Sequence, residues 1–301
     1  MGLGPITRLI SVGSIIADVR LDVPHLPARG GDVLGSAATV TAGGGFNVLA
    51  AAARQGLPCL FAGQHGSGPY GDRIRADLAR EGIASLLPAS AAADSGFCVV
   101  LVEPDGERTF ITSPGVEASL GARALADIPL QAGDAVFVSG YDLCYPDLGP
   151  AIAAWIGALP AGISLVVDPG PLVAEIPAAI LDVVLAKAAI WTMNRREAAL
   201  LGECVTRLAR SALLVVRDGA AGATLSGTEG FVTVTIPAPP VVMVDSTGAG
   251  DAHTGVLIAA LAAGLSPIPA VARANAAAAL AVTHKGPATA PTRAALDAFR
   301  A

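Results

Sequence analysis

The residues best suited to carry out chemistry lie in one stretch late in the chain. The apolar run 241–244 predicts a buried strand, and a turn containing Gly248 and Gly250 follows it. Small residues at 252–263 then predict a helix, which places Asp251 in its first turn. Free amides at a helix N-terminus attract anions, and the glycines let a ligand approach closely. A carboxylate there either stabilises the helix or takes a proton from an alcohol while the amides hold a phosphoryl group, and the glycines favour the second interpretation.

The composition indicates a globular α/β protein that binds small ligands. Of its 301 residues, 53% are hydrophobic and 15% are charged, which is enough to bury a large core. The formal charge is -6 and the only lysines are Lys187 and Lys285, which argues against a nucleic-acid or anionic-membrane surface. The four cysteines form no C-x-x-C pair, and no apolar run reaches about 18 residues. We therefore expect a cytoplasmic protein without a zinc site, a disulfide or a membrane span.

Three polar residues in the first half of the chain are suited to holding hydroxyl groups. Asp18 follows an apolar stretch, where its carboxylate could accept bonds from two adjacent sugar hydroxyls or form a turn. Asn47 follows a run of glycines and precedes an alanine-rich helix, so it could bind a hydroxyl or cap that helix. Arg108 lies on the return strand of a hairpin whose turn is 104–106, where it could contact substrate or remain solvated.

Strands and helices alternate through the middle of the chain, as in a largely parallel sheet. Asn194 and Glu197 follow one predicted strand and lie one helical turn apart, so they could hold a hydrated magnesium ion or form a capping pair. Asp168 ends the preceding predicted strand, at the sheet edge where α/β ligands bind, and receives no role. His253 lies two residues after the proposed base, and we expect it to be packed, neutral and without a catalytic role.

A glycine motif at 66–71 allows a different class of enzyme. It fits G-x-G-x-x-G, follows an apolar strand and precedes a helix, as in dinucleotide-binding folds. Pro69 removes an amide that a pyrophosphate would use, and the motif does not follow the first strand of the sheet. An NAD-binding oxidoreductase is therefore an alternative with less support.

The segment 245–251, DSTGAGD, resembles the C-terminal signature of the pfkB family of ribokinase-like carbohydrate kinases. The segment 41–47, TAGGGFN, resembles the N-terminal glycine motif of that family, and the likeness covers nearly the whole chain. The run 101–110, together with 139–141, resembles a less characterised bacterial branch of sugar kinases within that family. The resemblance implies an α/β fold of three layers, α/β/α, with a mostly parallel central sheet. It also implies one kinase domain, 1–301, with a small β lid from residues 16–40 and 95–113.

The same resemblance assigns roles to individual residues. Asp251 would be the catalytic base, and the amides of Gly248, Ala249 and Gly250 would stabilise developing negative charge. The resemblance also implies that the substrate is bound by Asp18, Gly43, Gly44 and Asn47. The residues implied to bind the nucleotide are Asn194, Glu197, Arg217, Gly219, Gly222 and Asn275. Glu197 would contact Mg²⁺ through water, and a monovalent cation would lie at Asp245 and Thr247. Ala42 replaces the first glycine of the N-terminal motif, and a shorter segment after Gly286 leaves the need for K⁺ open.

Together these features predict a kinase that transfers the γ-phosphoryl group of ATP to a hydroxyl of a small sugar, with Mg²⁺ as cofactor. A nucleoside kinase of the same fold is the alternative, since the sequence does not show whether a base pocket lies beside Asp18. A sugar-binding protein without catalysis is disfavoured by the intact Asp251, Asn194 and Glu197. An apolar outer face of the lid would favour a homodimer.

Overall fold

The computed structural model describes residues 4–209, 211–227 and 233–300. In this part of the chain the larger sheet has nine strands in the order β13-β12-β11-β10-β9-β8-β1-β4-β5. All neighbours pair in parallel except at β12, which runs antiparallel to both of its neighbours. The strands are β1 (Arg8–Ser11), β4 (Cys59–Phe61), β5 (Ala84–Ser85), β8 (Asp134–Ser139), β9 (Ser164–Asp168), β10 (Ile190–Asn194), β11 (Leu213–Arg217), β12 (Ala223–Gly227) and β13 (Val234–Ile236).

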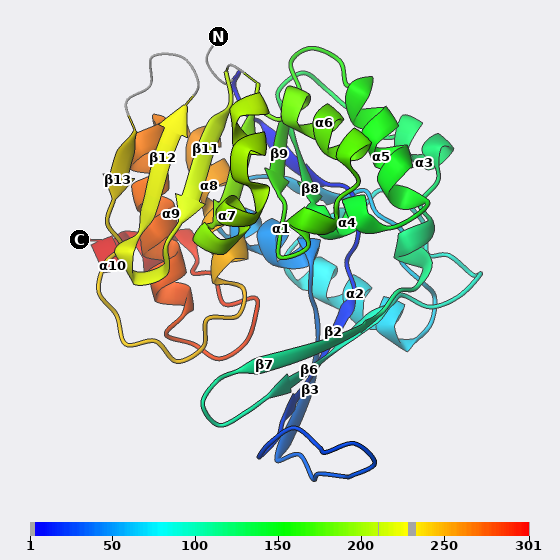
Figure 1. Ribbon diagram of the computed structural model, residues 1–301. Coiled ribbons are helices and arrows are strands. Elements are labelled where there is room, and N and C mark those ends of the chain that lie inside the picture. The colour runs from blue at the N-terminus through cyan, green and yellow to red at the C-terminus, as the bar shows by residue number, and fades with distance from the viewer. Residues whose placement is uncertain (1–3, 210, 228–232, 301) are drawn as a thin grey trace.

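Helices cover both faces of this sheet, which confirms the predicted three-layer α/β/α fold (Figure 1). One layer contains α1 (Gly45–Arg54), α2 (Pro69–Arg80), α8 (Ala249–Ala262) and α9 (Pro267–Ala281), with α10 (Arg293–Arg300) against α9; the other contains α3 (Ala122–Ala126), α4 (Gly140–Cys144), α5 (Leu148–Gly157), α6 (Ala178–Lys187) and α7 (Arg195–Leu201). No helix within the described ranges is long and apolar enough to cross a bilayer.

Alternation along the strands explains why both faces are covered. In β8, Ala135 and Phe137 pack into one hydrophobic cluster while Val136 and Val138 pack into the other. Successive side chains of a strand point to opposite faces, so a strand that is apolar throughout requires helices on both sides. The sheet is therefore the rigid element from which the site residues at its strand ends project.

A second, four-stranded sheet projects from the body of the molecule (Figure 1). It contains β2 (Ala17–Asp22), β3 (Ala37–Ala42), β6 (Phe97–Val102) and β7 (Arg108–Ser113), in the order β3-β2-β6-β7. We call it the small sheet. Its strands fall within or next to the two segments that were predicted to form a lid.

The two faces of the small sheet differ in charge. The paired rows that contain Asp18, Arg20, Asp22 and Arg108 lie on one face, which we call the inner face. The intervening rows form the outer face and carry no charged side chain; they consist of Ala17, Ala42, Phe97 and Ser113, then Val19, Val40, Val99 and Ile111, then Leu21, Ala38, Leu101 and Thr109. Strand residues alternate between the two faces of a sheet, so the pairing of the four strands decides which residues share a face.

The strand predicted at 241–244 does not form. This run has no strand assignment, and the side chains of Val242 and Met243 are 85% and 65% exposed. β13 already ends the large sheet, and the backbone here is held by bonds from the amides of Val244 and Asp245 to the carbonyl of Val282. The prediction was wrong because an apolar run can line a ligand cavity as irregular chain, which periodicity alone does not distinguish from a buried strand.

Candidate active site

The turn before α8 has the geometry of an anion site. Gly248 caps this helix with a positive φ of 72°. A Cβ at this position would lie 1.9 Å from the carbonyl oxygen of Pro287, so only glycine fits. The first amides of α8 have no acceptor within the helix, and Asp251 lies in the same first turn. The amides of residues 248–250 and a carboxylate therefore share one helix end, as predicted.

The carboxylate of Asp251 is largely buried at this helix end. Its Oδ2 accepts a hydrogen bond of 3.0 Å from Nδ2 of Asn47, which lies in α1. Burial raises the pKa of Asp251 to about 6, although the bond from Asn47 favours the charged form. A base with a pKa close to the working pH is effective in proton transfer. The Oδ1 atom of Asn47 is buried without a partner in the described part of the chain, so it can accept a bond from a bound hydroxyl.

Asp18 supplies a second carboxyl from the small sheet. A Cβ at Gly43 would lie 2.1 Å from Oδ2 of Asp18, so the glycine makes room for this carboxylate. Gly44, with a φ of 62°, caps α1 beside it. Burial and then the negative charge of Asp251 raise the pKa of Asp18 to about 7. The ionisation of Asp18 therefore depends on the charge of Asp251.

Arg217, at the end of β11, brings a positive charge to the same turn. Its Nη1 donates to Oδ2 of Asp168 at 2.9 Å and to the hydroxyls of Thr192 and Thr254 at 2.8 and 3.0 Å. A Cβ at Gly250 would lie 3.2 Å from Nη2 of Arg217, so the guanidinium lies directly beside the turn. Asp168, which received no role from the sequence, holds this guanidinium by an ion pair. Arg217 therefore places a guanidinium beside the amides of the turn, where it can contact an anionic group of a ligand.

Asn194 and Glu197 form a capping box at the start of α7. Oδ1 of Asn194 accepts a bond of 2.9 Å from the amide of Glu197, and Oε2 of Glu197 accepts one of 2.7 Å from the amide of Asn194. Burial, assisted by the charge of Asp168, raises the pKa of Glu197 above its usual value. The capping interpretation is confirmed. Nowhere in the described ranges do three His, Cys, Asp or Glu side chains gather in a way that could hold a metal ion.

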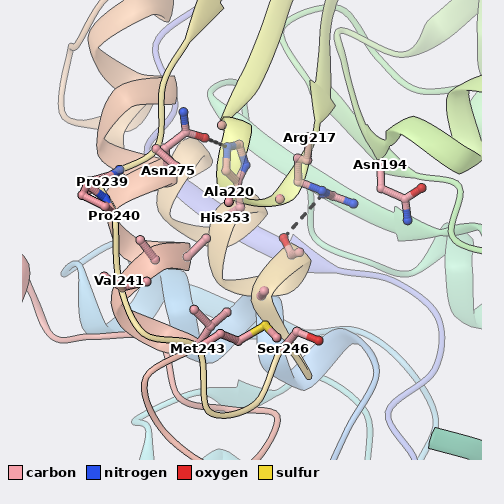
Figure 2. A pocket seen from close by; sticks show the side chains of 18 residues that line it. Asn194, Arg217, Ala220, Pro239, Pro240, Val241, Met243, Ser246, His253 and Asn275 are labelled. Carbon is pink, nitrogen blue, oxygen red and sulfur yellow. Dashed lines mark hydrogen bonds between the residues drawn. The ribbon is translucent and has the colours of Figure 1, made fainter. Parts of the chain in front are cut away.

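A cavity of about 500 Å³ adjoins the turn, within the usual size range of small-molecule sites (Figure 2). Among its lining residues are five of the six predicted to bind nucleotide, namely Asn194, Arg217, Gly219, Gly222 and Asn275. Figure 2 shows Arg217 and Asn194 at one end and Pro239, Pro240 and Val241 at the other. A polar end with a guanidinium and an apolar end suit a ligand that combines an anionic group with a flat ring.

His253 is buried in the wall of this cavity, next to Asn275 (Figure 2). The amide nitrogen of Asn275 donates to the carbonyl of Ile236 at 2.8 Å, which leaves Oδ1 of Asn275 to accept from Nε2 of His253 at 3.1 Å. Burial, and then the positive charge of Arg217, lower the pKa of His253 to about 3. The expectation of a packed, neutral histidine is confirmed.

The small sheet contacts the turn through two arginines. Arg108 in β7 donates to Oγ1 of Thr247 at 2.6 Å, and Arg20 in β2 donates to Oδ2 of Asp245 at 2.6 Å. The sequence analysis did not single out Arg20. It could have been found, because it lies two residues after Asp18 in a predicted strand and so projects from the same face.

The glycine motif at 66–71 holds a side chain of the protein itself. Oδ2 and Oδ1 of Asp94 accept bonds of 2.9 and 2.8 Å from the amides of Tyr70 and Gly71. A Cβ at Gly68 would lie 2.6 Å from the carboxyl carbon of Asp94. The carboxylate thus occupies the N-terminus of α2, where a dinucleotide fold would hold a pyrophosphate. This contact removes the basis for the oxidoreductase alternative.

Solved structures share this fold along nearly their full length. The ribokinase from Giardia lamblia matches with a TM-score of 0.84 at 21% identity, over 97% of this chain and 98% of that one. The adenosine kinase from Sinorhizobium meliloti matches with a TM-score of 0.82 at 19% identity, over 98% of each chain. The fold is therefore that of the ribokinase-like α/β proteins.

The sequence comparisons define the family. The model of the pfkB family carbohydrate kinases matches residues 6–294. The uncharacterized sugar kinase YegV of Escherichia coli (strain K12) is 36% identical over 295 residues, which cover 94% of this chain and 90% of that protein. The chain therefore belongs to the pfkB family of carbohydrate kinases, which confirms the predicted class of enzyme.

Proposed function

We propose that this protein transfers the γ-phosphoryl group of ATP, in the presence of Mg²⁺, to a hydroxyl of a small sugar. The observation that carries the proposal is the placement of Asp251, whose pKa is raised to about 6 at the N-terminus of α8. The cavity of about 500 Å³ adjoins this turn, while Asn47 and Asp18 surround the carboxylate from α1 and the small sheet. A phosphoryl donor and an acceptor hydroxyl would therefore meet at one turn.

Each group at the turn then has a defined part in the transfer. Asp251 accepts the proton of the acceptor hydroxyl, whose oxygen forms a bond to the γ-phosphorus while the bond to the leaving ADP oxygen breaks. The amides of residues 248–250 stabilise the negative charge on the transferring group. Arg217 adds a positive charge beside Gly250, and Asp168 fixes the direction of that guanidinium. Asn47 orients the Asp251 carboxylate by its hydrogen bond.

The cavity would hold the nucleotide, with phosphates towards Arg217 and the adenine near Asn275 and the apolar wall. Mg²⁺ would neutralise charge on the phosphate oxygens. Both oxygens of Glu197 already accept bonds from Asn194, so this carboxylate would act on the ion through water. That fits a site in which the phosphates supply most of the ligands. We leave K⁺ out of the reaction, because both carboxylate oxygens of Asp245 already accept hydrogen bonds from the protein. The use of ATP favours a cytoplasmic location.

Asp18 and Asn47 would bind the hydroxyl groups of the substrate. The unpaired Oδ1 of Asn47 and the carboxylate of Asp18 are acceptors, which is what a ligand rich in hydroxyls requires. A nucleoside with a sugar hydroxyl at this position is the second candidate.

We further propose that the small sheet acts as a lid within one kinase domain, 1–301. Its inner face carries Asp18, Arg20 and Arg108 towards the turn, which is where a lid must contribute contacts. Its outer face carries no charge, and we propose that it pairs with the same face of a second copy.

An ADP-release assay with ATP and Mg²⁺ across a panel of sugars and nucleosides tests the proposed function. We expect turnover with a sugar, and Asp251→Asn should lower kcat by roughly a hundredfold to ten-thousandfold while ATP still binds by calorimetry. Asp127→Asn, at a carboxylate that is 73% exposed just after the end of α3, is the matched control and should retain full activity. Faster turnover of nucleosides would favour the second candidate. Sugar binding without turnover would indicate a non-catalytic protein.

A further inference from the structure

The carboxylate of Asp245 is fully hydrogen-bonded between the turn and the small sheet. Its Oδ1 accepts bonds from the amide and the hydroxyl of Thr247, at 2.9 and 2.6 Å. Its Oδ2 accepts bonds of 2.6 Å from Nη1 of Arg20 and 3.1 Å from the amide of Gly286. Four donors therefore surround one carboxylate, and one of them carries a full positive charge.

The positive charge comes from the inner face of the small sheet. Nε of Arg20 also donates to Asp22, at 2.9 Å, so both ends of the guanidinium are held. Arg108, on the same face, donates to the hydroxyls of Thr247 and Ser246 at 2.6 and 3.0 Å and lies 3.6 Å from Oδ1 of Asp245. The two arginines balance Asp22 and Asp245, so the charges of this cluster sum to zero.

A monovalent cation does not fit this arrangement. The family resemblance assigns such an ion to Asp245 and the carbonyl of Thr247. Arg20 is paired with Oδ2 of Asp245 and Arg108 lies 3.6 Å from Oδ1, so a further positive charge at this carboxylate would lie next to two guanidinium groups. Partial burial favours the neutral acid, but the bonds from Thr247 and Arg20 hold the pKa of Asp245 below its usual value. The site is already neutralised by the protein.

We propose that the guanidinium of Arg20 takes the place of the monovalent cation, so that docking of the small sheet, rather than K⁺, orders the anion-binding turn. Arg20 acts through Asp245 and Thr247 on the turn that carries Gly248 and Gly250, and is thus a positioning residue. The small sheet is the lid of the proposed function. Lid closure over the sugar and ordering of the phosphoryl site are then one event, because the same arginine takes part in both.

The first test compares salts of equal ionic strength. The wild-type enzyme should show kcat and the KM for ATP in KCl that differ from those in choline chloride by less than about twofold. Its melting temperature, which requires neither substrate nor nucleotide, should also be the same in both salts. Activation by KCl of more than about fivefold, or a melting temperature raised by KCl alone, would overturn the proposal.

The second test removes the guanidinium. Arg20→Ala should lower kcat about tenfold or more in choline chloride, with partial rescue by KCl or by free guanidinium, while Arg20→Lys retains most of the rate. Its melting temperature should become sensitive to KCl. Arg123→Ala, at a side chain that is 97% exposed on α3, makes the same change in charge and should alter neither quantity. An Arg20→Ala enzyme with wild-type kcat in both salts contradicts the proposal.

These readouts separate the inference from the proposed function on which it rests. If no sugar or nucleoside is turned over by the wild type, the proposed function fails. The dependence of melting temperature on KCl, in the wild type and in Arg20→Ala, then still decides whether Arg20 replaces the cation.

Discussion

Among the individual residues, Asp251 and Asp18 determine how the reaction should respond to pH. The pKa of Asp251 is raised to about 6 and that of Asp18 to about 7, in both cases chiefly by burial. A base must be ionised to accept a proton, so activity is present above these values and lost as the pH falls through them. We expect kcat/KM for the sugar to decline below an apparent pKa between about 6 and 7. A rate profile measured in constant-ionic-strength buffers checks this.

Because the charge of Asp251 contributes to the raised pKa of Asp18, we assign this acid limb to the pair of carboxyls. Asp18→Asn should raise the KM for the sugar and move the limb towards the lower value, because only Asp251 then titrates. A wild-type profile that stays flat down to about pH 4, the usual carboxyl range, would show that neither raised pKa governs catalysis.

The sequence predicted the residues of the site better than their partners. Asp251, Asn194 and Arg217 could be found because each follows a recognisable strand or turn signal. Asp168 received no role from the sequence. It ends β9 and pairs with Arg217 at the end of β11, and these two strands lie on either side of β10 only in the folded sheet. Strand alternation would have placed Arg20 on the same face as Asp18, but it could not have predicted its partner, Asp245, which lies 225 residues away.

At the scale of secondary structure, the start of α8 depends on one glycine. Gly248 has a φ of 72°, and a Cβ there would lie 1.9 Å from the carbonyl oxygen of Pro287. Placing alanine in the left-handed conformation alone costs roughly 1 kcal/mol of folding free energy, and the clash with Pro287 adds to this, so Gly248→Ala should destabilise the protein by more than that amount. The substitution should also displace the amides of residues 248–250. We expect a lower melting temperature together with a loss of kcat.

Gly264 provides a matched control at the other end of this helix. Its φ is 85°, and a Cβ there would meet nothing within 4 Å. Gly264→Ala should carry the backbone strain alone, so its melting temperature should fall while kcat is unchanged. Equal loss of kcat in the two variants would mean that general destabilisation, rather than the geometry of the turn, controls the rate.

Local patterns predicted elements well where the pattern had one interpretation. The alanine-rich run after Gly43 and Gly44 forms the predicted helix, α1, and β6 and β7 form the predicted hairpin around the turn at 104–106. The run 241–244 was ambiguous, because valines and a methionine suit either a strand or the wall of a cavity. The glycines at 66–71 were equally ambiguous, and only the fold brings Asp94 to them.

For the whole molecule, the alternation of strands and helices predicted a largely parallel sheet and the family resemblance implied three layers, but neither predicted the order of the strands. In chain order the large sheet begins at β1, which lies between β8 and β4, and it ends at β13, which lies at one edge next to the antiparallel strand β12. Which strands become neighbours depends on helix packing and crossover direction, and these involve contacts between distant segments. The division of the small sheet into a charged and an uncharged face emerges only when its register is known.

That division leads to a prediction about assembly. The outer face of the small sheet carries no charged side chain, and Ile111 at its edge is 60% exposed. An uncharged sheet face of this kind is suited to pairing with its own copy about a twofold axis. We expect a homodimer in sedimentation or light-scattering measurements, and Ile111→Glu should shift it to monomer by placing two buried carboxylates at the interface.

Phe110→Glu is the matched control, since Phe110 is 57% exposed but lies on the inner face. Equal dissociation by both variants, or a monomeric wild type, would refute a dimer through the outer face.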